Sequence, residues 1–165
     1  MMDEEISFLS PINVSSIRLL RLSLDVNPNG PSGPCTTRVT VGCPERTLAS
    51  NDQDEHAWRE SIRFVLAIDL FEGNDQDQNV YLTASVEVLT TVQGDFSVGS
   101  EDSIERSLLK EAMLTSYEFA RNKIVSDVSL SPALNFTLPS ANADALLEVA
   151  LNDSPDGKSG QDEEM

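Results

Sequence analysis

The sequence predicts an α+β protein in which a four-stranded antiparallel sheet carries one long and one shorter C-terminal helix on one face. Two observations predict this class. Apolar and polar residues alternate at a period of two in four segments of the first part of the chain, and the period changes to about 3.6 after residue 99. Strands that are followed by helices, without alternating with them, favour an antiparallel sheet with one covered and one water-exposed face.

The first two predicted strands are separated by a loop. The first spans Ile17–Val26, and its buried face is formed by alternate apolar residues, Leu20, Leu22, Leu24 and Val26. Three prolines and two glycines in residues 27–34 cannot sustain a sheet ladder, so we expect a turn or an exposed loop there. The second predicted strand spans Thr36–Val41, with Thr37, Val39 and Val41 on one side.

The third and fourth predicted strands are longer and form a hairpin. They span Glu60–Phe71 and Val80–Val92, and in each of them alternate residues are apolar. The polar link of residues 72–79 favours antiparallel pairing of the two. Residues 50–55 are polar and have no apolar periodicity, so we expect a solvated connection before the third strand.

Two helices are predicted after the strands. The long one shows apolar or small residues at spacing four: Ile104, Leu108, Ala112, Ser116, Ala120, Ile124 and Val128. Asp102 and Glu105 form a capping-box-like pair at its start, and residues 129–132 are expected to end it. A shorter helix follows Pro139, and its predicted apolar side consists of Ala145, Leu146, Val149 and Ala150.

The composition is that of one acidic domain. The chain has 165 residues, and 11 Lys and Arg against 28 Asp and Glu give a net charge of −17. At about 100–200 residues per domain, this length accommodates one domain. A strongly negative field repels phosphate backbones and anionic lipid headgroups, which argues against nucleic-acid binding and membrane-surface binding.

The ends of the chain predict location and order. No apolar run approaches the roughly 18–20 residues that span a bilayer, and the start Met1–Glu5 is acidic rather than basic, so we expect a cytoplasmic protein without membrane insertion. We expect a flexible N-terminus over residues 1–13, a folded domain over 14–152, and a disordered acidic tail over 153–165 that has almost nothing to bury.

No set of residues points to catalysis, a cofactor or a metal. The single histidine, His56, stands in a polar run, where an exposed loop histidine is expected. Cys35 and Cys43 have no second pair to complete a zinc site, and we expect free thiols. The segment from Asp75 begins like a calcium loop but lacks two of the residues that such a loop requires. The glycine-rich motifs that bind dinucleotides or phosphates do not occur in the sequence. We therefore expect a protein that is not an enzyme and that acts through its surfaces.

Read in order, the residues resemble the SecB family of bacterial export chaperones over most of residues 14–152. No single motif is specific, but their order matches the family. The stretches that carry the resemblance are Ile17–Asp25 running into Pro28 and Asn29, Gly94–Val98, Phe119–Arg121 followed by Ile124, Leu134 with Asn135, Pro139, and Asp144–Leu146.

This resemblance implies a cytosolic, ATP-independent holdase that works as a homotetramer, a dimer of dimers. Such proteins bind unfolded precursor proteins in apolar grooves and deliver them to the motor ATPase SecA for export. The family's groove corresponds here to Thr37, Val39 and Val41. Its acidic docking face for SecA corresponds to Asp25 and Glu87.

Departures from the family pattern leave alternatives open. Arg21 and Leu89 occupy positions that are often acidic in the family, which weakens the expectation of delivery to SecA more than that of chaperoning. One alternative is a solitary SecB-like chaperone for a restricted client such as an antitoxin. Another is an interaction module of the same fold without general chaperone activity. Apart from the resemblance, Val39 and Val41 read simply as core residues of a strand.

Overall fold

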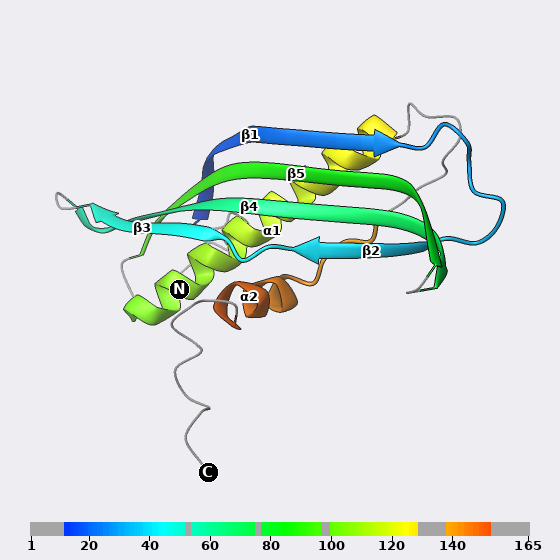
Figure 1. The fold of residues 1–165 in the computed structure, drawn as a ribbon. Helices are drawn as coiled ribbons and strands as arrows, with labels where there is room; N and C mark the ends of the chain where they lie inside the picture. Colours follow the sequence, from blue (N-terminus) through cyan, green and yellow to red (C-terminus); the bar gives the residue numbers. More distant parts are fainter. Residues whose placement is uncertain (1–11, 52–53, 75–76, 97–99, 129–137, 153–165) are drawn as a thin grey trace, which may run out of the picture.

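The computed structural model describes residues 12–51, 54–74, 77–96, 100–128 and 138–152. It confirms the predicted α+β class, with an antiparallel sheet and two helices after it (Figure 1). The elements are β1 (Ile12–Val26), β2 (Thr36–Val41), β3 (Glu45–Asn51), β4 (Asp54–Asn74), β5 (Asp77–Asp95), α1 (Glu101–Val128) and α2 (Ala143–Asn152).

The sheet has five strands rather than the four predicted, but it is only four strands wide. Its order is β1-β5-β4-β2, and β3 also pairs with β4. Since β4 is 21 residues long, β2 pairs with its C-terminal half and β3 with its N-terminal half, so that the two short strands follow each other along one edge. The predicted β4–β5 hairpin is present and pairs from Ala57 with Asp95 to Asn74 with Asp77.

The prediction of a solvated connection over residues 50–55 was wrong. Residues 50–51 end β3 and residues 54–55 belong to β4, with Asn51 paired to Asp54. This part of the hairpin extends beyond α1 in Figure 1. Because no helix covers it, backbone hydrogen bonds hold the two strands together without an alternation of apolar side chains.

Strand β1 is longer than predicted and is bulged. It begins at Ile12, so Ile12 and Asn13, which were assigned to the flexible N-terminus, belong to the sheet; residues 1–11 and 153–165 lie outside the described residues. The register with β5 shifts between Leu19 and Arg21. Leu20 is therefore the extra residue of a β-bulge. Leu19, and not Leu20, lies on the same side of the sheet as Leu22.

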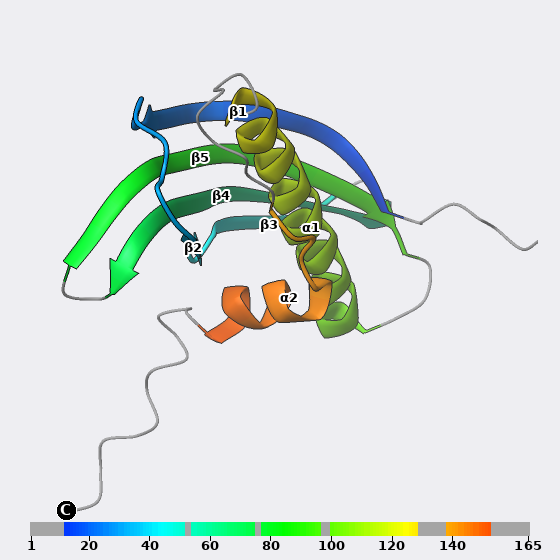
Figure 2. The ribbon, with the colours of Figure 1, turned by 90° about the vertical axis from the view of Figure 1, so that its right-hand side faces the viewer.

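The core lies between the sheet and α1. Alternate residues of β4 and β5 are buried, and Figure 2 shows the sheet curving over α1. A buried hydroxyl pair also joins the two layers, since Ser116 Oγ lies 2.7 Å from Thr90 Oγ1. The largest fully buried apolar side chains of the sheet are Phe64, Ile62, Leu66, Ile68, Leu82, Val86 and Val88, and those of α1 are Leu108, Leu109, Met113 and Ile124. Burial of each such side chain stabilises the folded state by roughly 1.5–3 kcal/mol.

The helix starts differ in detail from the prediction. Ser100, rather than Asp102, caps α1, because its Oγ accepts a hydrogen bond from the Ser103 backbone N–H at 3.2 Å. Asn142 caps α2 in the same way through the N–H groups of residues 144 and 145. The predicted end of α1 at residues 129–132 lies outside the described residues. In α2 the buried side is formed by Leu146, Leu147 and Ala150, while Ala145 is exposed.

Polar contacts bind the segment before α2 to α1. The Tyr117 hydroxyl donates to the Pro139 carbonyl at 2.8 Å, and Arg121 Nε donates to the Leu138 carbonyl at 2.8 Å. Lys110 and Asp144 form an ion pair at 2.7 Å, and this pairing lowers the pKa of Asp144. The chain therefore runs back along α1 toward the start of that helix, and α2 packs on α1.

A partly buried ion bridge connects β3, β4 and α1. Glu60 Oε1 of β4 accepts a hydrogen bond from Arg46 Nε of β3 at 2.8 Å, and Arg46 Nη2 lies 2.9 Å from Glu105 Oε1 of α1. The Glu60 side chain is 0% exposed, and its Oε2 has no hydrogen-bond partner among the described residues. Burial raises the pKa of Glu60, and the hydrogen bond from Arg46 lowers it in part. Arg46 is thus what makes a buried negative charge tolerable at this position.

Replacing Arg46 should therefore destabilise the fold in a pH-dependent way. We expect Arg46→Met to lower the free energy of unfolding at neutral pH by about 3–5 kcal/mol, because it leaves the Glu60 carboxylate buried and unpaired. Since the folded-state pKa of Glu60 is raised, the deficit should shrink as the pH falls through that pKa, where the carboxyl becomes neutral.

Urea unfolding of both proteins at several pH values measures this effect. The double variant Arg46→Met/Glu60→Gln is the control, and it should recover much of the lost stability because no buried charge remains. A deficit that is constant with pH would contradict the assignment.

Candidate polypeptide-binding surface

Exposed apolar side chains gather on the edge strand β1. Of the large hydrophobic side chains that are exposed among the described residues, Val14 and Leu19 (41% each), Leu20 (40%) and Leu24 (36%) belong to β1. The register places Leu19 and Leu24 opposite Val88 and Ala84, which are buried beneath the helices. We call Val14, Leu19, Leu22 and Leu24 the β1 margin. It is the apolar side of a strand whose outer edge pairs with no described strand.

The predicted groove residues form a second margin on the opposite edge. Thr37, Val39 and Val41 of β2 pair with Leu70, Ile68 and Leu66 of β4, whose side chains are buried on the helix-bearing side. Val39 is 40% exposed, Thr37 is exposed, and Val41 is partly buried against the core. We call these three residues the β2 margin. The structure brings them to one side of one edge strand, and Val39 is not a core residue.

The two residues of the predicted acidic face lie on the outer side of the sheet, away from the helices, but they differ in environment. Asp25 is exposed on β1 opposite Thr83. Glu87 lies opposite Arg21, is 18% exposed, and forms an ion pair with Arg63 of β4. An acid that is largely covered and neutralised by a neighbouring guanidinium contributes little to a negative docking surface.

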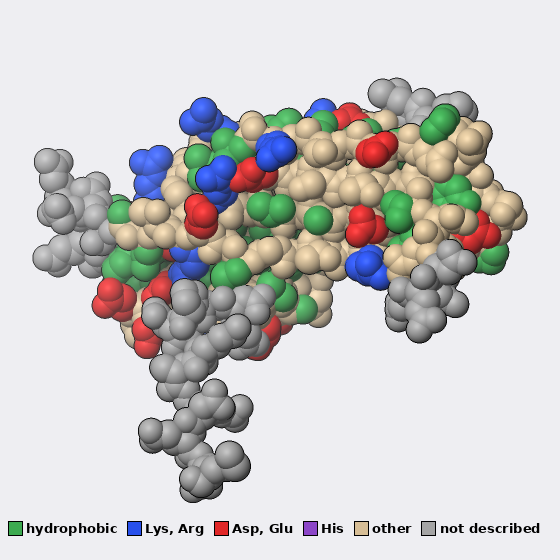
Figure 3. Space-filling model, in the orientation of Figure 1, with side chains coloured by type: hydrophobic (Ala, Val, Ile, Leu, Met, Phe, Trp, Pro, Cys, Tyr) green, Lys and Arg blue, Asp and Glu red, His purple; other side chains and the backbone are tan. Residues whose placement is uncertain are grey.

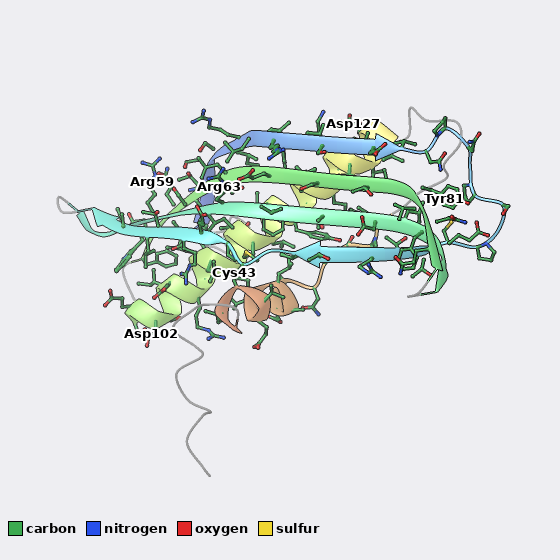
Figure 4. The ribbon with its side chains drawn as sticks, in the orientation of Figure 1. Cys43, Arg59, Arg63, Tyr81, Asp102 and Asp127 are labelled. Atoms are coloured by element: carbon green, nitrogen blue, oxygen red, sulfur yellow. The ribbon has the colours of Figure 1, made fainter. Side chains whose placement is uncertain are left out.

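The prediction from sequence missed a group of arginines on this outer side. We call Arg18, Arg21, Arg59 and Arg63 the arginine patch. Figure 3 shows Lys and Arg side chains gathered over this part of β1, β5 and β4, and Figure 4 labels Arg59 and Arg63. Their even separation along β4 was a signal that Arg59 and Arg63 share one side. The positions of Arg18 and Arg21 relative to them required the register and the bulge.

The loop between β1 and β2 packs against the far end of the β4–β5 hairpin. The Tyr81 hydroxyl donates to Glu72 Oε2 at 3.0 Å, which raises the pKa of Tyr81, and the Ser32 hydroxyl lies 3.4 Å from Glu72 Oε1.

Cys35 and Cys43 both carry free thiols. Burial raises the pKa of the Cys35 thiol, so it is not activated as a nucleophile.

The described part of the chain shows neither a metal site nor a helix that could cross a membrane. No group of three or more His, Cys, Asp or Glu residues there is arranged to hold a metal ion. In the same residues, no helix has both the length and the apolar character that crossing a bilayer demands.

Comparison with known proteins gives a likeness in fold. No protein-family model and no curated protein matches the chain. A SecB-like chaperone of Mycobacterium tuberculosis, solved with a ChAD peptide from the HigA1 antitoxin, is similar in structure with a TM-score of 0.51 and 16% sequence identity over 79% of this chain and 91% of that one. A protein of unknown function from Streptococcus agalactiae is less similar, with a TM-score of 0.35 and 12% identity over 76% and 97% of the two chains. The chain therefore has a SecB-like fold.

Substitutions on the two margins should leave the fold intact. We expect Leu24→Thr and Val39→Thr each to change the free energy of unfolding by less than about 1 kcal/mol, because the replaced side chains are exposed. Together they should reduce the fluorescence of a dye that binds apolar surface, such as bis-ANS. Thermal unfolding and dye titration measure both effects, and a loss of stability above about 2 kcal/mol would assign the residue to the core.

Proposed function

We propose that this protein is a SecB-like, ATP-independent molecular chaperone that holds unfolded polypeptides. The observation that carries the proposal is the β2 margin of a SecB-like fold, where Val39 is exposed and Val41 is partly exposed on an edge strand whose outer edge pairs with no described strand. The similar chaperone was solved with a bound peptide, which supports the binding of polypeptides by this fold. We likewise propose that the protein is cytoplasmic and has no catalytic activity.

The β2 margin offers two kinds of contact to an extended client. The outer edge of β2 presents backbone N–H and C=O groups that can pair with a client strand whatever its sequence. Val39 and Val41 provide apolar contacts, each worth at most about 1.5–3 kcal/mol when fully buried. Several such shallow contacts give binding without sequence specificity and need neither a nucleotide nor a reacting group.

The β1 margin fits a contact between subunits. Strand β1 is 15 residues long and forms the opposite edge of the sheet, with exposed apolar side chains on the helix-bearing side. A long apolar edge of this kind needs a cover in solution. We therefore assign β1 to assembly of the proposed homotetramer, which leaves β2 for clients.

A restricted client is a second candidate, because the similar chaperone was solved with an antitoxin peptide.

Delivery of precursors to SecA has weaker support. Of the two acids carried over from the family's docking face, Glu87 is paired with Arg63, and Arg21 stands beside it. The interaction module without general chaperone activity predicts binding of a single partner and of no unfolded protein.

Native mass spectrometry with an unfolded, slowly folding precursor tests the proposal. We expect a tetramer that retains the unfolded precursor and not its folded form. Val39→Asp should weaken retention by about tenfold or more, because a carboxylate cannot be buried against a client without a partner. Thr40→Asp on the other side of β2 is the matched control and should behave like the unchanged protein.

The outcomes separate the alternatives. Absence of retention at micromolar concentration would exclude general holdase activity. Retention of an antitoxin segment and of no other unfolded chain would establish the restricted client. Equal loss in the Val39 and Thr40 variants would remove the β2 margin from the binding site.

A further inference from the structure

The arginine patch is a compact group on the outer side of the sheet. Arg18 of β1 and Arg63 of β4 both pair with Leu89 of the central strand β5, so the three residues form one row across the sheet. With strands about 4.8 Å apart, the two arginines of this row start roughly 10 Å from each other. Arg21 lies in the next row, and Arg59 is four residues before Arg63 on the same side of β4.

Charge on this patch is incompletely neutralised. Arg63 pairs with Glu87 and lies 3.9 Å from Glu45, but Arg18, Arg21 and Arg59 form no ion pair with any side chain that the structure describes, and all three are exposed. Most cations elsewhere in the described part of the chain are paired. Arg46, Lys110, Arg121 and Lys123 form ion pairs, whereas Arg38, which lies over the Phe71 ring, and Arg106 form none among the described side chains. In a protein of net charge −17, three of the five described cations without an ion pair thus lie in one patch.

No described element covers this side of the sheet. Both helices lie on the opposite side, as Figure 2 shows. Leu89 and Val65 are partly exposed between the arginines. Apolar centres flanked by arginines are typical of protein interfaces. Guanidinium groups also bind carboxylates through two parallel hydrogen bonds.

The surroundings favour a short acidic peptide over a nucleic acid. Glu45 and Glu87 lie within the patch, and Asp25 and Asp69 are further along the same side of the sheet. A duplex carries one phosphate charge per about 1.7 Å and would extend over these acids. An extended peptide can instead present carboxylates about 6.7 Å apart on one side, close to individual arginines.

We infer that the arginine patch docks an acidic, extended segment of a partner protein. The patch places positive charge on the side of the sheet where the resemblance implied an acidic docking face. This inference goes beyond the proposed holdase activity, which concerns the other side of the sheet. Either can fail without the other, because the clients' apolar contacts lie on the β2 margin.

Fluorescence anisotropy with a labelled peptide of alternating Glu and Ser tests the inference. We expect saturable binding to the full chain that weakens as salt is raised, and no binding of the matched peptide of Gln and Ser. Arg18→Glu/Arg59→Glu should weaken binding by about tenfold or more. The control Arg106→Glu/Lys123→Glu changes the net charge equally but lies on α1, and it should leave binding within about twofold.

Three outcomes would overturn the inference. Equal loss in both double variants would mean that only the overall field acts. Tighter binding of a single-stranded oligonucleotide than of the acidic peptide would assign the patch to nucleic acid. Replacing Asp3, Glu4 and Glu5 by Asn, Gln and Gln is expected to change nothing, and tighter peptide binding in that variant would identify the chain's own acids as the occupant. Arg18→Gln/Arg59→Gln, which adds no negative charge, repeats the test if the first variant does not fold.

Discussion

The width of a single helix determines which parts of this sheet are covered. A helix with its side chains is about 10–12 Å across, whereas four strands at about 4.8 Å extend over nearly twice that width. Helix α1 therefore buries the two central strands β4 and β5, and the sheet is apolar on its helix-bearing side as far as both edges. The exposed apolar margins of β1 and β2 are what remains of that side. The proposed binding surface is thus a consequence of incomplete cover, and it needs no separate site.

The central elements could be predicted from sequence because their burial is periodic. Strands β4 and β5 and helix α1 bury every second residue or one side, and the pattern of apolar residues reports this directly. Strand β3 escaped prediction because an ion bridge and backbone pairing hold it in place. Glu60 is also a carboxylate on the buried side of β4, in line with Ile62 and Phe64. The alternation of apolar and polar residues along a strand assigns such a carboxylate to the exposed side.

The surfaces were less predictable than the core. The β2 margin was reached through resemblance and period two together, and the structure places its three residues on one side of the edge strand, with Val39 exposed and Val41 partly buried. The arginine patch depends on three strands from distant parts of the chain. One extra residue at Leu20 decides which side Arg21 and Leu19 occupy, and no propensity reports a bulge at a leucine.

The two irregularities of β1 also limit how far a neighbouring strand can extend along it. They lie between Val14 and Ser16 and between Leu19 and Arg21, so the longest regular stretch of this edge is Arg21–Val26. A bulge increases local twist and disrupts the hydrogen-bond ladder. An incoming strand can therefore form only a short ladder before its register is broken. Growth of a fibre by strand addition along β1 is hindered in this way.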